Sequence, residues 1–288
     1  PPTYFPTHLT GGFWTRTFYA LPMKTNFRLI AVTLTLLSAS LAGCLGGDDD
    51  DGGYSGPIDL VVFYESTSGM IETSMNNGQA GQTTGVTLSF DFADTTSDDG
   101  TITKITLDPD DGSDVIEADP SDDAVISYEW LTHGVFEIML GAEDEEGNTH
   151  DIEISVRIDV HAVWTEFNTD SATMTFDATP DCEDGQPIAD KITISSTVTN
   201  PGGTIFQPGQ DSDVTWSLTD PAEEEVASKT GIIGDGAPPE TWDLVVDEVV
   251  EGIWTLNVEV TDGDNVNVEN DVTITYPEGS EDSPNPRT

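Results

Sequence analysis

The chain has 288 residues, of which 55 are acidic and only 8 are basic, so its formal net charge is −47 at pH 7. Such a surface is repelled by phosphate backbones and anionic headgroups, which excludes nucleic acid and charge-driven membrane adsorption as partners. Hydrophobic residues make up 36% of the chain and recur periodically, so we expect folded acidic domains rather than a disordered polyanion.

This charge also constrains the folded state. Repulsion among so many carboxylates destabilises a compact chain, and salt relieves it because the electrostatic screening length falls to roughly 3 Å at 1 M. The pattern resembles the secreted proteins of halophilic or marine archaea. We therefore expect the melting temperature to rise with salt or divalent cations.

Residues 1–22 lie before the first methionine, Met23, and contain aromatic residues without a clear period. We interpret this segment as an unstructured extension upstream of the true start, which takes no part in the fold. The alternative is a genuine N-terminal extension of the protein.

Residues 23–43 have the layout of a secretory signal helix. Lys24 and Arg28 provide the positive start, and residues 29–41 form an apolar run that is followed by the small residues Ala42 and Gly43. The run is shorter than the roughly 20 apolar residues of a membrane-spanning helix, and Thr and Ser interrupt it. We therefore expect a signal peptide here.

The run closes with Leu41-Ala42-Gly43-Cys44, which resembles the lipobox of prokaryotic lipoproteins. The resemblance implies cleavage before Cys44, a diacylglyceryl group on its sulfur and stable attachment to the extracellular face of the cell membrane. The alternative is a plain signal peptide or an uncleaved anchor helix with an incidental cysteine.

Residues 44–57 are rich in Gly and Asp and are predicted to form a flexible acidic linker. Cys182 is the only other cysteine, so it has no intrachain disulfide partner if Cys44 is lipidated. Acidic neighbours disfavour its thiolate, and we expect an inert thiol.

Residues 58–160 are predicted to form a first β-sandwich. Apolar and polar residues alternate in short runs, and Asp/Gly-rich turn signals separate them. Alternation with a period of two is typical of half-buried strands, and many short strands at this spacing favour a sandwich. The predicted strands are 86–92, 102–107, 135–140 and 152–158.

Four motifs in this region, in order, resemble those of the polycystic-kidney-disease (PKD) domain. They are Ser97-Asp98-Asp99-Gly100, Leu107-Asp108-Pro109-Asp110-Asp111-Gly112, the strand from Gly134 to Leu140, and Asp144-Glu145-Glu146-Gly147. Leu107 replaces the Trp of the family, and Pro109-Asp110 replaces its Phe-Gly. The resemblance implies an immunoglobulin-like sandwich and a role in interaction rather than catalysis.

Residues 161–276 are predicted to form a second, immunoglobulin-like and PKD-like sandwich, because residues 252–276 repeat residues 134–158 at a constant offset of 118. The coinciding pairs are Gly134/Gly252, Val135/Ile253, Phe136/Trp254, Ile138/Leu256, Leu140/Val258, Asp144/Asp262, Ile154/Val272, Val156/Ile274 and Ile158/Tyr276. We interpret the shared unit as the last hairpin of a sandwich, and a period this long indicates tandem domains.

The remaining strands predicted for this region are 173–176, 191–198, 214–218 and 242–246, and Trp216 resembles the buried core Trp of immunoglobulin-like sandwiches. Residues 277–288 are rich in Pro, Ser and Glu and are predicted to be a disordered tail. The predicted fold class is therefore all-β, with two tandem sandwiches after a signal helix and a linker.

A calcium site is the one cofactor hypothesis that the sequence offers. Asp108, Asp110, Asp111 and Asp114 surround one turn, and hard cations take several oxygen ligands from a flexible loop. The spacing does not match an EF-hand loop, which would have a ligand where Gly112 stands. Diffuse counterion uptake is the alternative in so acidic a chain.

No motif in the chain argues for catalysis. After Cys44 the histidines are His133, His150 and His161, and we interpret each as a surface residue without a partner. Nucleophile-elbow, zinc-protease and phosphate-loop motifs are absent from the sequence. The aromatic residues whose place in a core the sequence does not decide are Trp130, Trp164 and Trp242.

We therefore expect a non-enzymatic, lipid-anchored surface protein that acts in adhesion, as a spacer, or in contact with extracellular proteins or glycans. An accessory lipoprotein that captures a solute or glycan for a transporter or hydrolase is the alternative. A concave pocket or an exposed aromatic surface favours the second reading.

Overall fold

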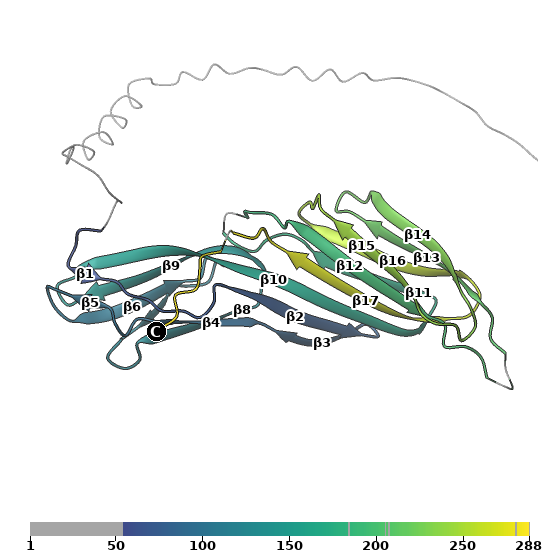
Figure 1. Cartoon of the computed structure of the whole chain (residues 1–288), viewed down its shortest axis with the longest axis horizontal. Coiled ribbons are helices and arrows are strands. Elements are labelled where there is room, and N and C mark those ends of the chain that lie inside the picture. The colour runs from purple at the N-terminus through teal and green to yellow at the C-terminus, as the bar shows by residue number, and fades with distance from the viewer. Residues whose placement is uncertain (1–53, 184, 205, 207, 280, 288) are drawn as a thin grey trace, which may run out of the picture. The chain divides into compact units, whose positions relative to one another are not determined.

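The computed structural model describes residues 54–183, 185–204, 206, 208–279 and 281–287. The predictions for residues 1–53, Cys44 among them, lie outside this part of the chain. The described residues form seventeen β-strands and no helix, which confirms the all-β prediction (Figure 1). Accordingly, no helix within the described ranges is long and apolar enough to cross a membrane.

The main sheet has nine strands: β2 (Ser68–Asn76), β3 (Gln79–Thr84), β6 (Ile102–Asp108), β7 (Ile116–Ala118), β9 (Gly134–Asp144), β10 (Thr149–Thr169), β12 (Lys191–Thr199), β15 (Glu240–Val246) and β17 (Val266–Thr275). A second sheet has four: β11 (Ser171–Asp177), β13 (Ser212–Thr219), β14 (Glu225–Ile233) and β16 (Ile253–Asp262). Two short ladders join β1 (Ile58–Asp59) to β5 (Thr96–Ser97) and β4 (Val86–Asp91) to β8 (Val125–Trp130).

Strand β10 organises the main sheet because its 21 residues are shared among three neighbours. Residues 149–158 pair antiparallel with β9, and residues 160–169 pair antiparallel with β17. Strand β2 runs parallel to β10 along residues 157–165, so it occupies the opposite edge (Figure 1). The predicted boundary between residues 160 and 161 thus falls inside a continuous strand.

Two clusters of buried side chains lie along this sheet. The first core is centred on Phe90, Trp130 and Phe136, which are fully buried. The second core joins Trp216 and Trp254 from the four-stranded sheet to residues of β12 and β17. Strands β12 and β13 alternate buried and more exposed residues, which is the pattern expected when one strand face covers a core.

The repeated segment does not form the same structure twice. Strands β9 and β10 pair with each other as a hairpin, as the repeat predicts. The hairpin prediction is wrong for the second copy, because β16 pairs with β11 and β13 whereas β17 pairs with β10 and β12. The chain therefore crosses from one layer to the other between β16 and β17.

The C-terminal segment lies against the first core, whereas the sequence predicts a disordered tail. Asn285 exchanges two backbone hydrogen bonds with Tyr64, at 2.8 and 3.0 Å. Arg287 makes ion pairs with Asp91 and Asp94 at 3.0 and 2.9 Å and lies over the ring of Phe63. This isolated bridge with Tyr64 satisfies backbone groups that composition alone assigns to solvent.

Candidate binding pocket

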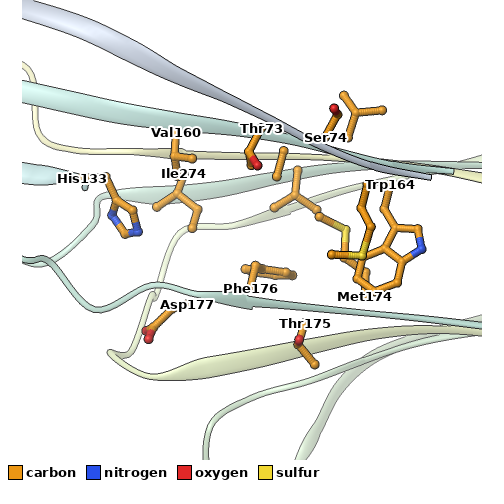
Figure 2. A pocket seen from close by; sticks show the side chains of 14 residues that line it. Thr73, Ser74, His133, Val160, Trp164, Met174, Thr175, Phe176, Asp177 and Ile274 are labelled. Atoms are coloured by element: carbon orange, nitrogen blue, oxygen red, sulfur yellow. The ribbon is translucent and has the colours of Figure 1, made fainter. Parts of the chain in front are cut away.

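A pocket of about 270 Å³ opens beside β11, where the two layers of the second core differ in width. The main sheet continues from β17 and β10 to β2 and β3, while the four-stranded sheet ends at β11. Among the described strands, the main sheet therefore extends past the last strand of the layer above it, and residues of β10, β2 and β11 line the pocket there (Figure 2).

The register of β17, β10 and β2 fixes which side chains face the pocket. Val272, Ala162 and Thr73 stand side by side on one face, because Ala162 pairs with both of the other residues. One step along the same face, Trp164 pairs with Met75. Successive residues on one strand face repeat every two positions, so these rows form a continuous wall.

The opposite wall comes from β11, whose buried positions are Ala172, Met174 and Phe176. Trp164 is half-buried and lies near Met174 at one end of the pocket (Figure 2). Its indole N–H donates to a carboxylate oxygen of Glu166 at 2.9 Å, so the ring is oriented by a hydrogen bond as well as by packing. This end presents aromatic and thioether surface to a ligand.

The other end of the pocket is polar and is marked by His133 and Asp177 (Figure 2). His133 Nδ1 lies 2.7 Å from the hydroxyl of Tyr276, which is fully buried. Burial lowers the pKa of His133, although Asp181 and Asp177 oppose this shift. The imidazole is therefore neutral near pH 7, and it offers a hydrogen bond rather than a charge.

The other histidines also have partners, so their interpretation as isolated surface residues is wrong. His161 lies between Glu72 and Asp271, at 2.6 and 3.0 Å. His150 stacks on the ring of Tyr54 with ring centroids 3.7 Å apart. The sequence offers no signal for these contacts because each joins segments far apart in the chain.

The four acidic residues of the calcium hypothesis lie at the end of β6 and in the segment that follows it. Asp108 accepts a hydrogen bond from the N–H of Asp110, and Asp110 in turn accepts one from the N–H of Glu137 at 2.8 Å. Asp111 accepts hydrogen bonds from the N–H of Ser113 at 3.0 Å and from the hydroxyl of Tyr128 at 2.5 Å. The carboxylates of Asp108, Asp110 and Asp111 therefore accept hydrogen bonds that stabilise the conformation of the turn.

Asp114 is exposed, and it lies beyond the three carboxylates that shape the turn. Among the described residues, no group of three or more His, Cys, Asp or Glu side chains is arranged to hold a metal ion. Specific calcium binding by Asp108, Asp110, Asp111 and Asp114 stays a prediction.

The sequence does not predict this pocket. It leaves open whether Trp164 lies in a core, and in the structure this side chain is half-buried at one end of the pocket. Trp130 and Trp242, left undecided with it, are buried. The sequence gives no strand signal for Thr73 and Met75, because the only apolar residues of β2 are Met70, Ile71 and Met75, and these do not alternate with polar ones. Parallel pairing is usually indicated in a sequence by a helix between the two strands, and no such helix precedes β10 among the described residues.

Comparison with known proteins identifies no family. No family model matches the chain, and no curated protein matches it. The PKD resemblance therefore stays a prediction.

Solved structures show weak likeness. A carbohydrate-binding module of the β-sandwich superfamily is 12% identical, covers 78% of this chain and 100% of its own, and gives a TM-score of 0.28. A CBM4 structure is 10% identical, covers 48% of this chain and 70% of its own, and gives a TM-score of 0.24. Tripeptidyl peptidase 2 is 10% identical, covers 75% of this chain and 20% of its own, and also gives a TM-score of 0.24.

Proposed function

We propose that this protein is a non-catalytic surface module that binds an extracellular glycan or protein through the pocket beside β11. The observation that carries the proposal is that the partly exposed indole of Trp164 lines the same concave site as the buried thioether of Met174 and the buried ring of Phe176. Aromatic side chains are enriched among the residues that contribute most to recognition, and ligand sites are concave and lined mainly by apolar and aromatic side chains.

The net negative charge of the chain restricts the kinds of ligand that the pocket can bind. A net charge of −47 repels anionic ligands, and the exposed Asp177 adds a carboxylate at the last position of β11, beside the polar end of the pocket. The site is therefore suited to a neutral or cationic ligand with one flat apolar face. A neutral sugar ring and an aromatic or aliphatic side chain both have such a face.

The second candidate is an accessory lipoprotein that captures a soluble solute or glycan for a transporter or hydrolase. The concavity of the pocket favours it over a purely structural spacer. The two candidates differ in the form of the ligand, because a capture protein binds a free small molecule, whereas a surface module binds the same group within a polymer or a protein.

Membrane attachment through Cys44 is part of the proposal and rests on the Leu-Ala-Gly-Cys pattern. A Cys44→Ser variant is expected to leave the membrane fraction and appear in the medium. Retention of the variant in the membrane fraction would overturn the anchor while leaving the pocket untouched.

The test of the pocket is binding of the full-length chain to glycan and peptide arrays in molar salt. A Trp164→Ala variant is expected to lose roughly 30-fold in affinity, which corresponds to the loss of one aromatic anchor. The control is Phe167→Ala, which removes an aromatic ring that is 54% exposed and does not line the pocket. Equal binding by both variants, at unchanged melting temperature, would contradict the proposal.

A further inference from the structure

The outer edge of β11 carries backbone groups that can pair with another strand. β11 is the end strand of the four-stranded sheet and pairs only with β16 among the described strands. The N–H of Val260 donates to Asp170, and the N–H of Ala178 donates to Gly252, so hydrogen-bonded pairs stand just before and just after the strand. Hydrogen-bonded and non-hydrogen-bonded pairs alternate along an antiparallel ladder.

This alternation assigns each residue of β11 to one edge. Even-numbered residues bond to β16, so Ser171, Thr173, Thr175 and Asp177 direct their backbone groups to the outer edge. Ser171 is already satisfied, because its N–H and C=O both bond to the hydroxyl of Thr169. The backbone of Asp177 bonds to His133.

Thr173 and Thr175 are the two residues of β11 whose outward backbone groups are still to be accounted for. Within the described ranges, no strand pairing or backbone hydrogen bond reaches their outward N–H and C=O groups. Four backbone groups at the spacing of a β-ladder therefore face outward, and Thr175 lines the pocket. A row of unpaired strand groups is a template for a further strand.

The main sheet provides a floor for such a strand. It extends to β2 and β3 beyond the point where the four-stranded sheet ends. A strand added to β11 would lie over Thr73 and Met75, and every second side chain would point toward them. The pocket volume of about 270 Å³ lies below the range of roughly 300–1,000 Å³ for drug-sized ligands, so it suits one large side chain.

The carboxylates near β11 indicate which kind of protein segment could supply the added strand. Exposed carboxylates lie at both ends of β11, from Asp170 just before the strand and from Asp177 at its last position. They attract cationic residues on either side of the bound segment. A second copy of this chain would bring another net charge of −47 to the same surface, which disfavours self-pairing.

We propose that β11 binds an extended segment of another protein by strand addition, with a large apolar side chain in the pocket and Lys or Arg at both ends of the segment. This inference rests on the proposed function, because it names the partner class of the same pocket. Strand addition draws affinity from main-chain hydrogen bonds and specificity from the pocket that receives an alternate side chain.

The probe is a set of nine-residue peptides of the form Lys-Thr-Val-Thr-X-Thr-Val-Thr-Lys, in which X is Phe, Tyr, Trp, Leu, Met or Ala. Two N-methylated forms of the tightest peptide block alternate sets of backbone N–H groups. Binding to the full-length chain is measured by calorimetry in molar salt. Replacing Lys by Asp at both peptide ends tests the charge requirement.

The matched protein variants are Thr175→Pro, which removes one outward N–H, and Thr175→Val, which keeps it with a side chain of similar size. Proline is tolerated on an edge strand when its position makes no ladder bond. We expect the peptide with a large apolar X to bind, and Thr175→Pro but not Thr175→Val to weaken it roughly tenfold or more. Only one of the two N-methylated peptides should lose binding to a similar extent.

Several results would overturn strand addition. One is failure of every peptide to bind, and another is equal weakening by both N-methylation patterns. If glycan binding nevertheless depends on Trp164, the proposed function survives and only the partner class falls. A dimer of the chain in sedimentation that dissociates in Thr175→Pro would identify a second copy, not another protein, as the occupant. The N-methylated peptides keep the test decisive even if Thr175→Pro does not fold.

Discussion

The strand pairs β9–β10 and β16–β17 arise from the same sequence pattern but have different ladders. β9 and β10 pair with each other, whereas β16 and β17 lie in different sheets. Most apolar positions of both copies are buried, although Ile253, the counterpart of the buried Val135, is 52% exposed, so alternation predicts most of the buried face of a strand. It does not predict the partner, which depends on which strand edges the rest of the chain leaves open.

The connections between the strands differ accordingly. Asp144 ends β9 and is buried, where it accepts hydrogen bonds from Ser97 at 2.7 Å and from Asn148. Asp262 ends β16 and is exposed, and the next residue, Gly263, has a φ of 104°. A side chain at Gly263 would collide with the backbone of Asp211, so this turn requires glycine.

The largest expected effect compares equivalent core residues in the two copies. Phe136→Ala and Trp254→Ala each remove a buried aromatic side chain and are expected to lower the free energy of unfolding by about 3–5 kcal/mol. Because β10 spans both cores, we expect a single transition in urea for each variant, by fluorescence and by circular dichroism. Two separated transitions would show that the cores unfold independently.

A smaller effect is expected at the ends of the repeats, where Ile158 coincides with Tyr276. Both are buried, but only Tyr276 has a hydroxyl, and it bonds to His133. Tyr276→Phe leaves the imidazole without this partner and is expected to cost about 1–3 kcal/mol in urea unfolding. Ile158→Val is the control, since it removes one methyl group at the equivalent position. An unchanged midpoint in Tyr276→Phe would show that the hydrogen bond contributes nothing net.

The two turn aspartates provide the third comparison. Hydrogen bonds from Asn148 and Ser97 lower the pKa of Asp144 to about 2, outweighing burial. Its contribution is present above pH 3.8, the ordinary value, and is lost as the pH falls through about 2. Asp144→Ala should therefore lower the melting temperature at pH 6 more than at pH 2. Asp262→Ala should have little effect at either pH, and equal effects of the two would contradict this account.

The smallest expected effect concerns two histidines that titrate in opposite senses. Burial lowers the pKa of His133, so its contribution is present above pH 6.5 and is lost as the pH falls below that value. Burial alone would also lower the pKa of His161, but hydrogen bonds to Asp271 and Glu72 raise it, so its contribution is present below pH 6.5 and is lost at higher pH.

Melting curves between pH 5 and pH 8 can separate these two histidines. Removing His161 with a Gln substitution should destabilise the chain more at pH 5.5 than at pH 8, by less than about 1 kcal/mol because the pair is partly exposed. His133→Gln should relieve part of the loss of stability on acidification. The same pH dependence in both variants would contradict these assignments.

Much of the fold could be predicted from local pattern. The predicted strands at 191–198 and 242–246 correspond to β12 and β15, and Trp216 is buried as expected. Strand β14 was missed because most of its residues are exposed, and β3 because all of them are. A strand that buries no face has no periodic apolar signal.

The site was harder to predict than the fold. Trp164 stands out in the sequence, but its neighbour Met75 is brought to it by parallel pairing across 89 positions of the chain. The open edge at Thr173 and Thr175 depends on where a sheet ends, which is a property of the topology. Nothing in the sequence of β11 indicates that it has a neighbour on only one side among the described strands.

Hydrogen exchange of the full-length chain, with and without the tightest array ligand, tests the central claim most directly. Among the described strands, the outward amides of Thr173 and Thr175 have no ladder partner, so they should exchange quickly in the free protein. We predict that the ligand slows their exchange and that of residues 73–75, while the acidic turn at residues 108–114 is unaffected. Protection that appears elsewhere and leaves β11 unchanged would contradict the assignment of the binding site.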